Sequence, residues 1–390
     1  MTEATLVRDM SQVPGRNLLE VATDLVPLLR ENAKAVEEGR RLTPAVHEAF
    51  LQAGFYRMTT PQENAISPRS LPELMRVLET LAFGDASSAW TAWAGLGMPA
   101  MSAFMDDAGV TELYDSPEHV VIGSTAGMGR ATAVEGGYWV TGHWSFLSGI
   151  RQASHAGGLC SAFDGETQRL GPQGGPAVVL PIWSVADCTV IENWESTGLR
   201  GTGSHDMDAH EIFVPYHRVI DFTKPPRPDL GPVYYIEIDN AANVTVASIA
   251  VGTASAAIEA FRELAFRKRL EDGTLLAESP QAKLALGLAE TQLAQVRGHL
   301  WETVEVMWET LLDGTHDAEA WFPRTAMASV TAVQAATDVA LSLYRAAGTS
   351  AVRAGILDRI VRDLLTLSAH RTVQPGNLLK HGGASFQYAN

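Results

Sequence analysis

The sequence predicts an α+β protein in three consecutive parts: a helical N-terminal domain, a central β-unit and a C-terminal helical bundle. Three observations predict this order. Apolar residues recur at helical spacing in the first third, short β-branched and aromatic runs separated by turn residues follow, and long helical patterns then return. We therefore place the domains at 1–118, 119–232 and 233–390.

Helix signals dominate the N-terminal third. Leucine and valine repeat at helical spacing between Leu18 and Leu29, with charged residues between them. A second helix is expected to begin at Thr43-Pro44, a capping residue followed by proline in the first turn, and to end at Gly54. Further helical patterns cover 71–83, 87–95 and 100–104.

The apolar period changes near Val120. Short runs rich in β-branched and aromatic residues, bounded by Gly, Pro, Asp or Asn, are expected to be strands. They cover 120–124, 130–134, 138–147, 155–163, 177–183 and 208–214. The Glu135-Gly136-Gly137 segment is suited to a hairpin turn. Strands at this spacing predict an antiparallel barrel or sandwich.

The chain becomes helical again from about Asp239. Turn and breaker residues separate the long segments at Asp272-Gly273, Ser279-Pro280 and Asp313-Gly314. A last helix is expected from Leu357 to about His370, with an apolar stripe along one face. Four helices with short links predict a four-helix bundle.

Composition excludes several classes of function. The 390 residues carry a formal net charge of −16, which repels phosphate backbones and anionic membranes, so we expect no nucleic-acid and no membrane partner. The sequence contains no run of about 18 apolar residues, so we expect no membrane-spanning helix. The N-terminus lacks the apolar region of a signal peptide. We interpret Cys160 and Cys188 as buried free thiols in a reducing cytoplasm.

Motifs for several common chemistries are missing. We find no Gly-x-Gly-x-x-Gly after a strand, no P-loop and no nucleophile elbow. The His-x-x-Glu-x-x-Glu segment at 299–305 has the reverse of the di-iron order and is best interpreted as an exposed helix face. The polar segment 205–210 offers alternating Asp and His side chains, but a polar loop leading into a strand explains it better than a metal site. We expect no metal.

Several stretches carry a resemblance to a known family. They are an opening helical pattern over 29–57, Asp-Ala-Ser-Ser-Ala-Trp at 85–90, the hairpin Gly-Gly-Tyr-Trp-Val-Thr-Gly-His-Trp-Ser-Phe-Leu-Ser-Gly at 136–149, Gly-Leu-Arg-Gly-Thr-Gly-Ser at 198–204 with Phe-Val-Pro at 213–215, and Leu-Asp-Arg with Arg-Asp within 357–363. In this order they resemble the acyl-CoA dehydrogenase superfamily, from about Leu18 to about Ala384. Within it they resemble the two-component flavin-dependent monooxygenases.

The resemblance implies a specific architecture and reaction branch. It implies an N-terminal helical domain, a central β-barrel and a C-terminal four-helix bundle, assembled as a homotetramer with flavin at the subunit interface. His370-Arg371-Thr372 stands where many dehydrogenases of this superfamily carry their catalytic glutamate. Without that carboxylate, abstraction of an α-proton lacks a base, so oxygenation is favoured over acyl-CoA dehydrogenation.

A mechanism and its partners follow from the same resemblance. Reduced FAD or FMN (FADH2 or FMNH2) would arrive from a separate NAD(P)H-flavin reductase. Reaction with O2 would give a flavin C4a-hydroperoxide, which hydroxylates a small (hetero)aromatic or natural-product substrate. The cofactor would carry the difficult chemical step, and the protein would position it and shield it from water. The sequence leaves the choice between FAD and FMN open.

The hairpin and the strand before it supply the expected flavin contacts. Ser148 falls on the family's threonine beside the flavin ring, and Trp144, Phe146 and Ser148 would share one strand face if no bulge intervenes. Gly123 and Ser124 match a flavin-edge loop after a strand, where a simple loop is the alternative interpretation.

Two arginines of the third part are candidates for the flavin diphosphate. Arg267 and Arg269 stand where dehydrogenases place an arginine from a neighbouring subunit, and surface helix charge is the alternative. His370 is expected to act as a base or as a hydrogen-bond partner of peroxide or substrate. Without the resemblance, it reads as part of a solvated polar face.

The substrate pocket is expected to involve Trp93, Met98 and His370. Phenol hydroxylases of this branch tend to carry a histidine where Met98 stands, so an apolar, adaptable pocket for an indole-like or sulfur-containing heteroaromatic is favoured. Trp93 and Met98 are equally suited to a plain core. The alternatives are an acyl-CoA dehydrogenase, an amino-sugar N-oxygenase of the same fold, and a non-catalytic scaffold.

Overall fold

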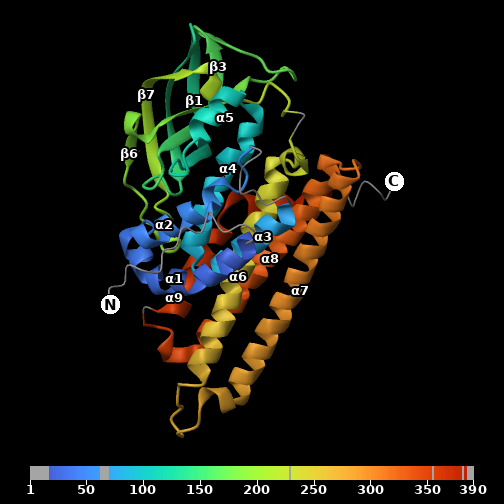
Figure 1. The fold of residues 1–390 in the computed structure, drawn as a ribbon. Helices are drawn as coiled ribbons and strands as arrows, with labels where there is room; N and C mark the ends of the chain where they lie inside the picture. Colours follow the sequence, from blue (N-terminus) through green and yellow to red (C-terminus); the bar gives the residue numbers. More distant parts are fainter. Residues whose placement is uncertain (1–16, 62–69, 228–229, 354, 380–381, 384–390) are drawn as a thin grey trace.

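The computed structural model describes residues 17–61, 70–227, 230–353, 355–379 and 382–383 of the chain. Figure 1 shows an elongated molecule. The β-rich part forms one end, the N-terminal helices lie in the middle, and long helices of the C-terminal part extend to the opposite tip. Helices therefore precede and follow the strands in the chain, as the sequence predicts.

Local capping sets the boundaries of the N-terminal helices, which are α1 (Leu18–Gly39), α2 (Pro44–Ala53), α3 (Leu71–Gly84), α4 (Ala86–Met101) and α5 (Asp107–Tyr114). The predicted second helix is confirmed, because the Thr43 hydroxyl accepts the N–H of Val46 and Gly54 ends the helix at φ 73°. The sequence predicts separate helices over 87–95 and 100–104. The structure has one continuous helix, α4, up to Met101, and a short 3-10 turn over Ser102–Phe104. The sequence did not predict α5.

The strands of the middle part form one mixed sheet. They are β1 (Val121–Val134), β2 (Gly137–Leu147), β3 (His155–Asp164), β4 (Thr167–Gln168), β5 (Val178–Ser184), β6 (Thr189–Ile191), β7 (His205–Pro215) and β8 (Val219–Asp221). Their order is β6-β7-β2-β1-β3-β5-β8, with β4 on β3. The prediction of a purely antiparallel sheet is wrong, because β1 and β3 pair in parallel. The pairing path ends at β6 and β8, so a closed barrel is not confirmed.

Long-range pairing decides the strand details that the sequence pattern missed. The two strands expected at 120–124 and 130–134 are the single strand β1, whose register with β3 shifts between Ser124 and Gly129. The short strands β4, β6 and β8 escaped prediction, because two or three residues carry too little periodicity. Both cysteines are free thiols, but only Cys160 is buried as expected, and Cys188 is half-buried.

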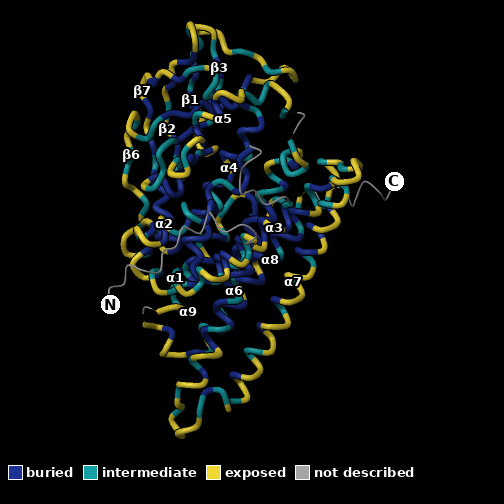
Figure 2. The backbone as a smooth tube through the Cα atoms, viewed as in Figure 1, coloured by how far each residue is buried: buried dark blue, intermediate teal, exposed yellow. Residues whose placement is uncertain are grey.

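The C-terminal helices are α6 (Ile238–Ala265), α7 (Pro280–Leu312), α8 (Ala318–Ala347) and α9 (Ile356–Ser368). Helix α6 packs against α3 of the N-terminal part as well as against α8 and α9. A Cβ at Gly252 of α6 would lie 2.1 Å from the carbonyl oxygen of Glu79, so glycine permits this close helix approach. Figure 2 shows the shared core as buried backbone where α3, α6 and α8 meet. The domain boundaries proposed from the sequence stay a prediction.

Two helices of this part are long and apolar enough to cross a membrane by length and composition alone. They are Ile238–Ala265 and Ala318–Ser350, with mean hydropathy 1.6 and 1.3. Within this chain, however, 89% and 61% of their apolar windows are buried. We therefore interpret both as core helices, which pass the same test when other helices cover them.

Candidate active site

A bulge near the end of β2 determines which side chains face outward. The pairing of β2 with β7 is irregular between Trp144 and Leu147, and Phe146 adopts a left-handed backbone conformation at φ 64°. The common face of Trp144, Phe146 and Ser148, expected only in the absence of a bulge, is therefore not formed. Trp144 is fully buried and donates its indole N–H to the carbonyl of Leu159, whereas the Phe146 side chain is 61% exposed.

A polar contact from β7, supported by a residue that follows β6, holds the bulge in place. The carboxylate of Asp206 accepts the backbone N–H of Phe146 at 3.3 Å. The same carboxylate accepts the side-chain amide of Asn193 at 2.7 Å. The ring of Phe146 consequently points away from the sheet core and meets Trp194 edge-on, with ring centroids 6.2 Å apart. An exposed aromatic ring held at such a backbone angle is a candidate contact for a planar ligand.

A cavity of about 280 Å³ lies beside the exposed ring. It is lined by Ser145, Phe146, Asn193, Trp194, Glu195, Ser196, Ser204 and Asp206. Two aromatic side chains and several hydroxyl, amide and backbone groups thus surround one space. An isoalloxazine ring has the matching chemistry, since it combines flat aromatic faces with polar edges. The residues present fit a flavin at this position.

A chain of hydrogen-bonded hydroxyl groups ends at the same cavity. The indole N–H of Trp90 donates to the Ser148 hydroxyl at 3.1 Å, and Ser148 contacts the hydroxyl of Ser204 at 2.7 Å. Ser204 in turn contacts Thr202 at 2.6 Å, and Thr202 donates to the carbonyl of Leu199 at 2.8 Å. All three hydroxyl residues are buried. The sequence singled out Ser148 but missed Ser204 and Thr202, although both belong to the Gly-Thr-Gly-Ser segment.

The second catalytic candidate, His370, packs on two tryptophans. Its ring centroid lies 5.2 Å from that of Trp90 and 5.6 Å from that of Trp93, both edge to face. Helix α9 ends at Ser368, so His370 lies in the turn that follows and not on a helix face. The interpretation of His370 as part of a solvated face is therefore wrong. Trp90, which the sequence did not single out, joins Ser148 and His370 in one cluster.

The surroundings of His370 keep its imidazole neutral. Burial, with a smaller effect of the Arg371 charge, lowers its pKa to about 4. Nδ1 of the ring lies 2.9 Å from the hydroxyl of Thr372, which fixes the orientation of the ring. A neutral imidazole both donates and accepts a hydrogen bond. His370 is therefore equipped to orient a polar group, but not to carry a positive charge near neutral pH.

The expected flavin-edge residues lie within a strand and not in a loop. Gly123 and Ser124 belong to β1, just before its register shift. The Ser124 hydroxyl donates to the carbonyl of Ser145, which lines the cavity, at 2.6 Å. Ser124 therefore supports the cavity wall from the neighbouring strand. A Cβ at Gly123 would lie 2.3 Å from the sulfur of Met98, so glycine lets α4 pack closely on β1.

The structure divides the expected substrate-pocket residues between two places. Trp93 faces Trp90 and His370 and donates its indole N–H to the hydroxyl of Thr245 at 2.9 Å. Met98 is buried in a separate apolar cluster that includes Met101 and Met105. Trp93 and Met98 lie five residues apart on α4 and face different sides of the helix, so only Trp93 contacts His370 here. One pocket formed jointly by Trp93, Met98 and His370 stays a prediction.

The two candidate phosphate ligands lie far from the cavity within this chain. Figure 1 shows that the loop after α6 is at the tip of the long helices, opposite the β-rich part. There Arg267 forms an ion pair with Glu263 at 3.0 Å, and Arg269 donates to the carbonyl of Gly273 at 2.7 Å. A contact of these arginines with flavin in a neighbouring subunit stays a prediction.

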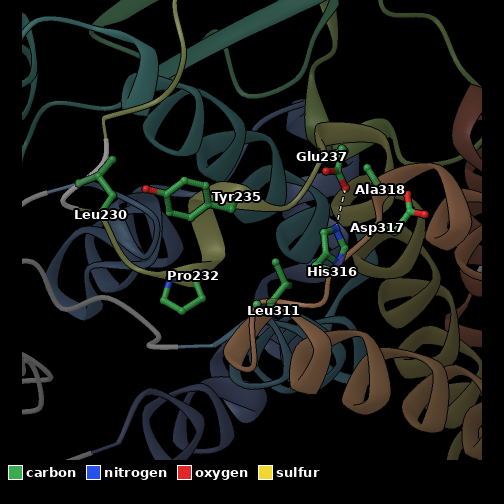
Figure 3. Close-up of a pocket in the computed structure, with 9 residues that line it drawn as sticks. Leu230, Pro232, Tyr235, Glu237, Leu311, His316, Asp317 and Ala318 are labelled. Carbon is green, nitrogen blue, oxygen red and sulfur yellow. Dashed lines mark hydrogen bonds and ion pairs between the residues drawn. The ribbon is translucent and has the colours of Figure 1, made fainter.

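A larger cleft, of about 630 Å³, lies between the start of α6, the end of α7 and the start of α8 (Figure 3). Glu237 and His316 form an ion pair at 3.1 Å in its wall, and none of the site residues predicted from the sequence lines it. We place the active site at the smaller cavity, because that cavity meets the exposed Phe146 ring and the hydroxyl chain.

Comparison with protein families identifies the C-terminal part. Residues 244–375 match the family described as "Acyl-CoA dehydrogenase, C-terminal domain". This segment is therefore similar to the C-terminal domain of acyl-CoA dehydrogenases. It begins within α6 and ends seven residues after α9, so it holds the helix bundle together with His370. The superfamily resemblance seen in the sequence is confirmed.

Curated relatives confirm the monooxygenase branch of the resemblance. An indole-3-acetate monooxygenase of Pseudomonas putida is 25% identical over 338 residues, which are 85% of this chain and 84% of that protein. The oxygenase component of an FADH2-dependent resorcinol hydroxylase of a Rhizobium species is 29% identical over 213 residues, or 54% of this chain and 50% of that protein.

Solved structures show the same fold along nearly the whole chain. The protein XiaF from a Streptomyces species, in complex with FADH2 and glycerol, aligns with a TM-score of 0.85 at 22% identity and covers 95% of both chains. The protein TdsC from a Paenibacillus species, in complex with FMN and indole, aligns with a TM-score of 0.78 at 17% identity, over 96% of this chain and 98% of that one.

Proposed function

We propose that this chain is the oxygenase component of a two-component flavin-dependent monooxygenase, which inserts one oxygen atom of O2 into a small aromatic or heteroaromatic compound. The single observation that carries the proposal is the exposed Phe146 ring beside a cavity that also meets a buried hydroxyl chain. The names of the relatives, which are monooxygenases and hydroxylases, support the class of reaction.

Phe146, Trp194 and the hydroxyl residues are the side chains that would hold the flavin. The bound reduced flavin would supply the reaction with O2 that makes one oxygen atom available for transfer. Phe146 and Trp194 would cover its aromatic surface and exclude water, which protects a reactive cofactor from hydrolysis. Ser204 would hydrogen-bond a polar edge of the ring, and Ser148 would position Ser204 from behind.

His370 would position the substrate and not act as its base. A base works best when its pKa is near the working pH. The lowered pKa of His370, about 4, makes its imidazole a weak base at neutral pH. A neutral ring with Nδ1 directed to Thr372 can still hydrogen-bond a polar group of the substrate. The neighbouring edges of Trp90 and Trp93 suit a flat aromatic molecule.

An indole-like compound is the substrate class that we favour. Trp93 and His370 offer aromatic surface and one neutral polar group, and neither provides a charge to stabilise a phenolate. A relative that acts on indole-3-acetate and a structural neighbour solved with indole support this choice. The separate NAD(P)H-flavin reductase is part of the same proposal, supported by relatives named as oxygenase components.

Assembly into a homotetramer is also proposed, with α7 at the contact. Leu284 and Leu288 are 64% and 60% exposed and lie four residues apart on one face of this helix. Large apolar side chains exposed together on a helix face commonly mark a protein contact. Light scattering of the wild type and of Leu284→Glu/Leu288→Glu tests this assembly. A monomeric wild type contradicts it.

The test of the proposed function is isotope transfer from O2. The purified protein would be supplied with NADH, a general flavin reductase, FMN or FAD, and indole or indole-3-acetate, under 18O2. We expect a product that gains one 18O atom by mass spectrometry, with Phe146→Ala as the impaired variant. Oxidation of NADH without labelled product from any compound of an indole and phenol panel would contradict the proposal.

A further inference from the structure

The hydroxyl chain at the cavity has a fixed direction, set by its last acceptor. The carbonyl of Leu199 can only accept, so the single hydroxyl hydrogen of Thr202 points to it at 2.8 Å. Ser204 must then donate to Thr202, and Ser148 must donate to Ser204, because each hydroxyl carries one hydrogen. The indole N–H of Trp90 completes the chain by donating to Ser148.

This direction leaves the hydroxyl chain with an acceptor, and no donor, at the cavity. Ser204 lines the cavity, and its hydrogen is committed to Thr202. The hydrogen of Ser148 is likewise committed to Ser204. A ligand group that approaches the Ser204 oxygen from the cavity therefore meets a lone pair and must itself donate. N5 of a flavin carries a hydrogen in the reduced form and offers only a lone pair in the oxidised form.

A buried carboxyl group of α9 holds the backbone of Leu199, the residue whose carbonyl ends the chain. Oδ1 of Asp363 accepts the backbone N–H of Leu199 at 2.6 Å, while Leu199 has a left-handed backbone at φ 48°. A Cβ at Gly198 would lie 1.9 Å from the carbonyl oxygen of Arg362, so the turn is pressed against the backbone of α9. The carbonyl of Leu199 also accepts the indole N–H of Trp194 at 3.0 Å, so one peptide supports both the hydroxyl chain and an aromatic wall of the cavity.

We propose that Asp363 is a positioning residue which, by holding the backbone of Leu199, fixes the direction of the Thr202–Ser204–Ser148 chain, so that the end of this chain at the cavity favours the reduced flavin. The inference rests on the proposed function, because it presumes that flavin binds beside Ser204. It assigns a role to a residue of α9 that contacts neither cofactor nor substrate. It also gives a physical reason why the site would distinguish the two redox states of the flavin.

The charge state of Asp363 indicates that asparagine is the conservative replacement for this residue. Burial and the neighbouring Asp85 carboxylate raise the pKa of Asp363 to about 8, so the group is largely neutral at pH 7. Asparagine keeps a neutral acceptor oxygen at the same place, whereas alanine removes the acceptor. Leu364 is fully buried on the same helix, and Leu364→Ala is the matched control for a general loss of stability.

The experiment compares dissociation constants for the two redox states of the flavin. FMN and FAD, oxidised in air or reduced by dithionite without oxygen, would be titrated against the full chain by quenching of tryptophan fluorescence. We expect the wild type, Asp363→Asn and Leu364→Ala to prefer reduced flavin. Asp363→Ala should lose about five- to tenfold of that preference, the size of one hydrogen bond.

A second variant keeps the test decisive if Asp363→Ala does not fold. Thr202→Val keeps the side-chain shape but removes the hydroxyl at the end of the chain, so it should lose the preference to a similar extent. Equal preference in Thr202→Val, Asp363→Ala and the wild type would overturn the inference while leaving the flavin site intact. A wild type that binds neither form of flavin would overturn the proposed function, and this inference with it.

Discussion

Replacing Ser148 by alanine tests the hydroxyl chain in the folded protein and in the flavin reaction. The change removes the acceptor of the Trp90 indole N–H and the partner of the Ser204 hydroxyl. Trp90 is 7% exposed, so water is a poor substitute for the lost acceptor. A buried donor left without its partner costs about 1–3 kcal/mol. The unfolding entropy of 390 residues is roughly 0.8 kcal/mol/K. Dividing the lost free energy by this entropy gives a decrease in Tm of about 1–4 °C.

The assay pairs differential scanning calorimetry with stopped-flow oxidation of reduced flavin by O2. Ser148→Ala is expected to lower Tm and to speed the return of oxidised flavin, whereas Ser148→Thr keeps the hydroxyl and both properties. Ser154→Ala is a matched control, since its half-buried hydroxyl bonds the backbone of Val120 elsewhere in the β-rich part. A Ser148→Ala protein with unchanged Tm and unchanged flavin oxidation would refute the reasoning.

Three further predictions follow from the site. The pKa of His370, about 4 in the folded protein, lies below its ordinary value of 6.5, so the unfolded chain binds more protons between these pH values. The free energy of unfolding of the wild type should therefore fall by about 3 kcal/mol more than that of His370→Gln as the pH is lowered from 6.5 to 4 in urea titrations; parallel curves would count against the buried histidine. Phe146→Ala should weaken flavin binding by about 0.5–1.5 kcal/mol in fluorescence titrations, and Trp139→Ala, another exposed aromatic of β2, should not; equal losses would remove Phe146 from the site. Gly123→Ala should displace Met98 and cost about 1–3 kcal/mol in denaturant unfolding, and an unchanged stability would mean that α4 does not approach β1 as closely as described.

Features fixed by neighbouring residues could be predicted from the sequence. Thr43 and Gly54 bound α2 because a cap and a left-handed glycine act within one turn of the helix. The order of helices, strands and helices followed from apolar periods in the same way. The hairpin motif located Ser148, and the family resemblance directed attention to His370.

Features fixed by distant residues could not be predicted. The bulge at Phe146 depends on the Asp206 carboxylate sixty residues later, and it reversed the expected orientation of the Trp144 and Phe146 side chains. The pKa and orientation of His370 depend on its packing against Trp90 and Trp93, which lie on a helix of the N-terminal part. A period of two or 3.6 residues carries no information about such contacts.

The most direct test of the account is the reaction of the protein-bound reduced flavin with O2 in the absence of substrate. The protein would be mixed with reduced FMN or FAD under anaerobic conditions and then with oxygenated buffer, while the absorbance of oxidised flavin is followed. If the cavity beside Phe146 binds flavin and shields it from water, oxidised flavin will appear only after a delay and more slowly than from free flavin. Return to oxidised flavin at the rate of free flavin, with no delay, would contradict the account.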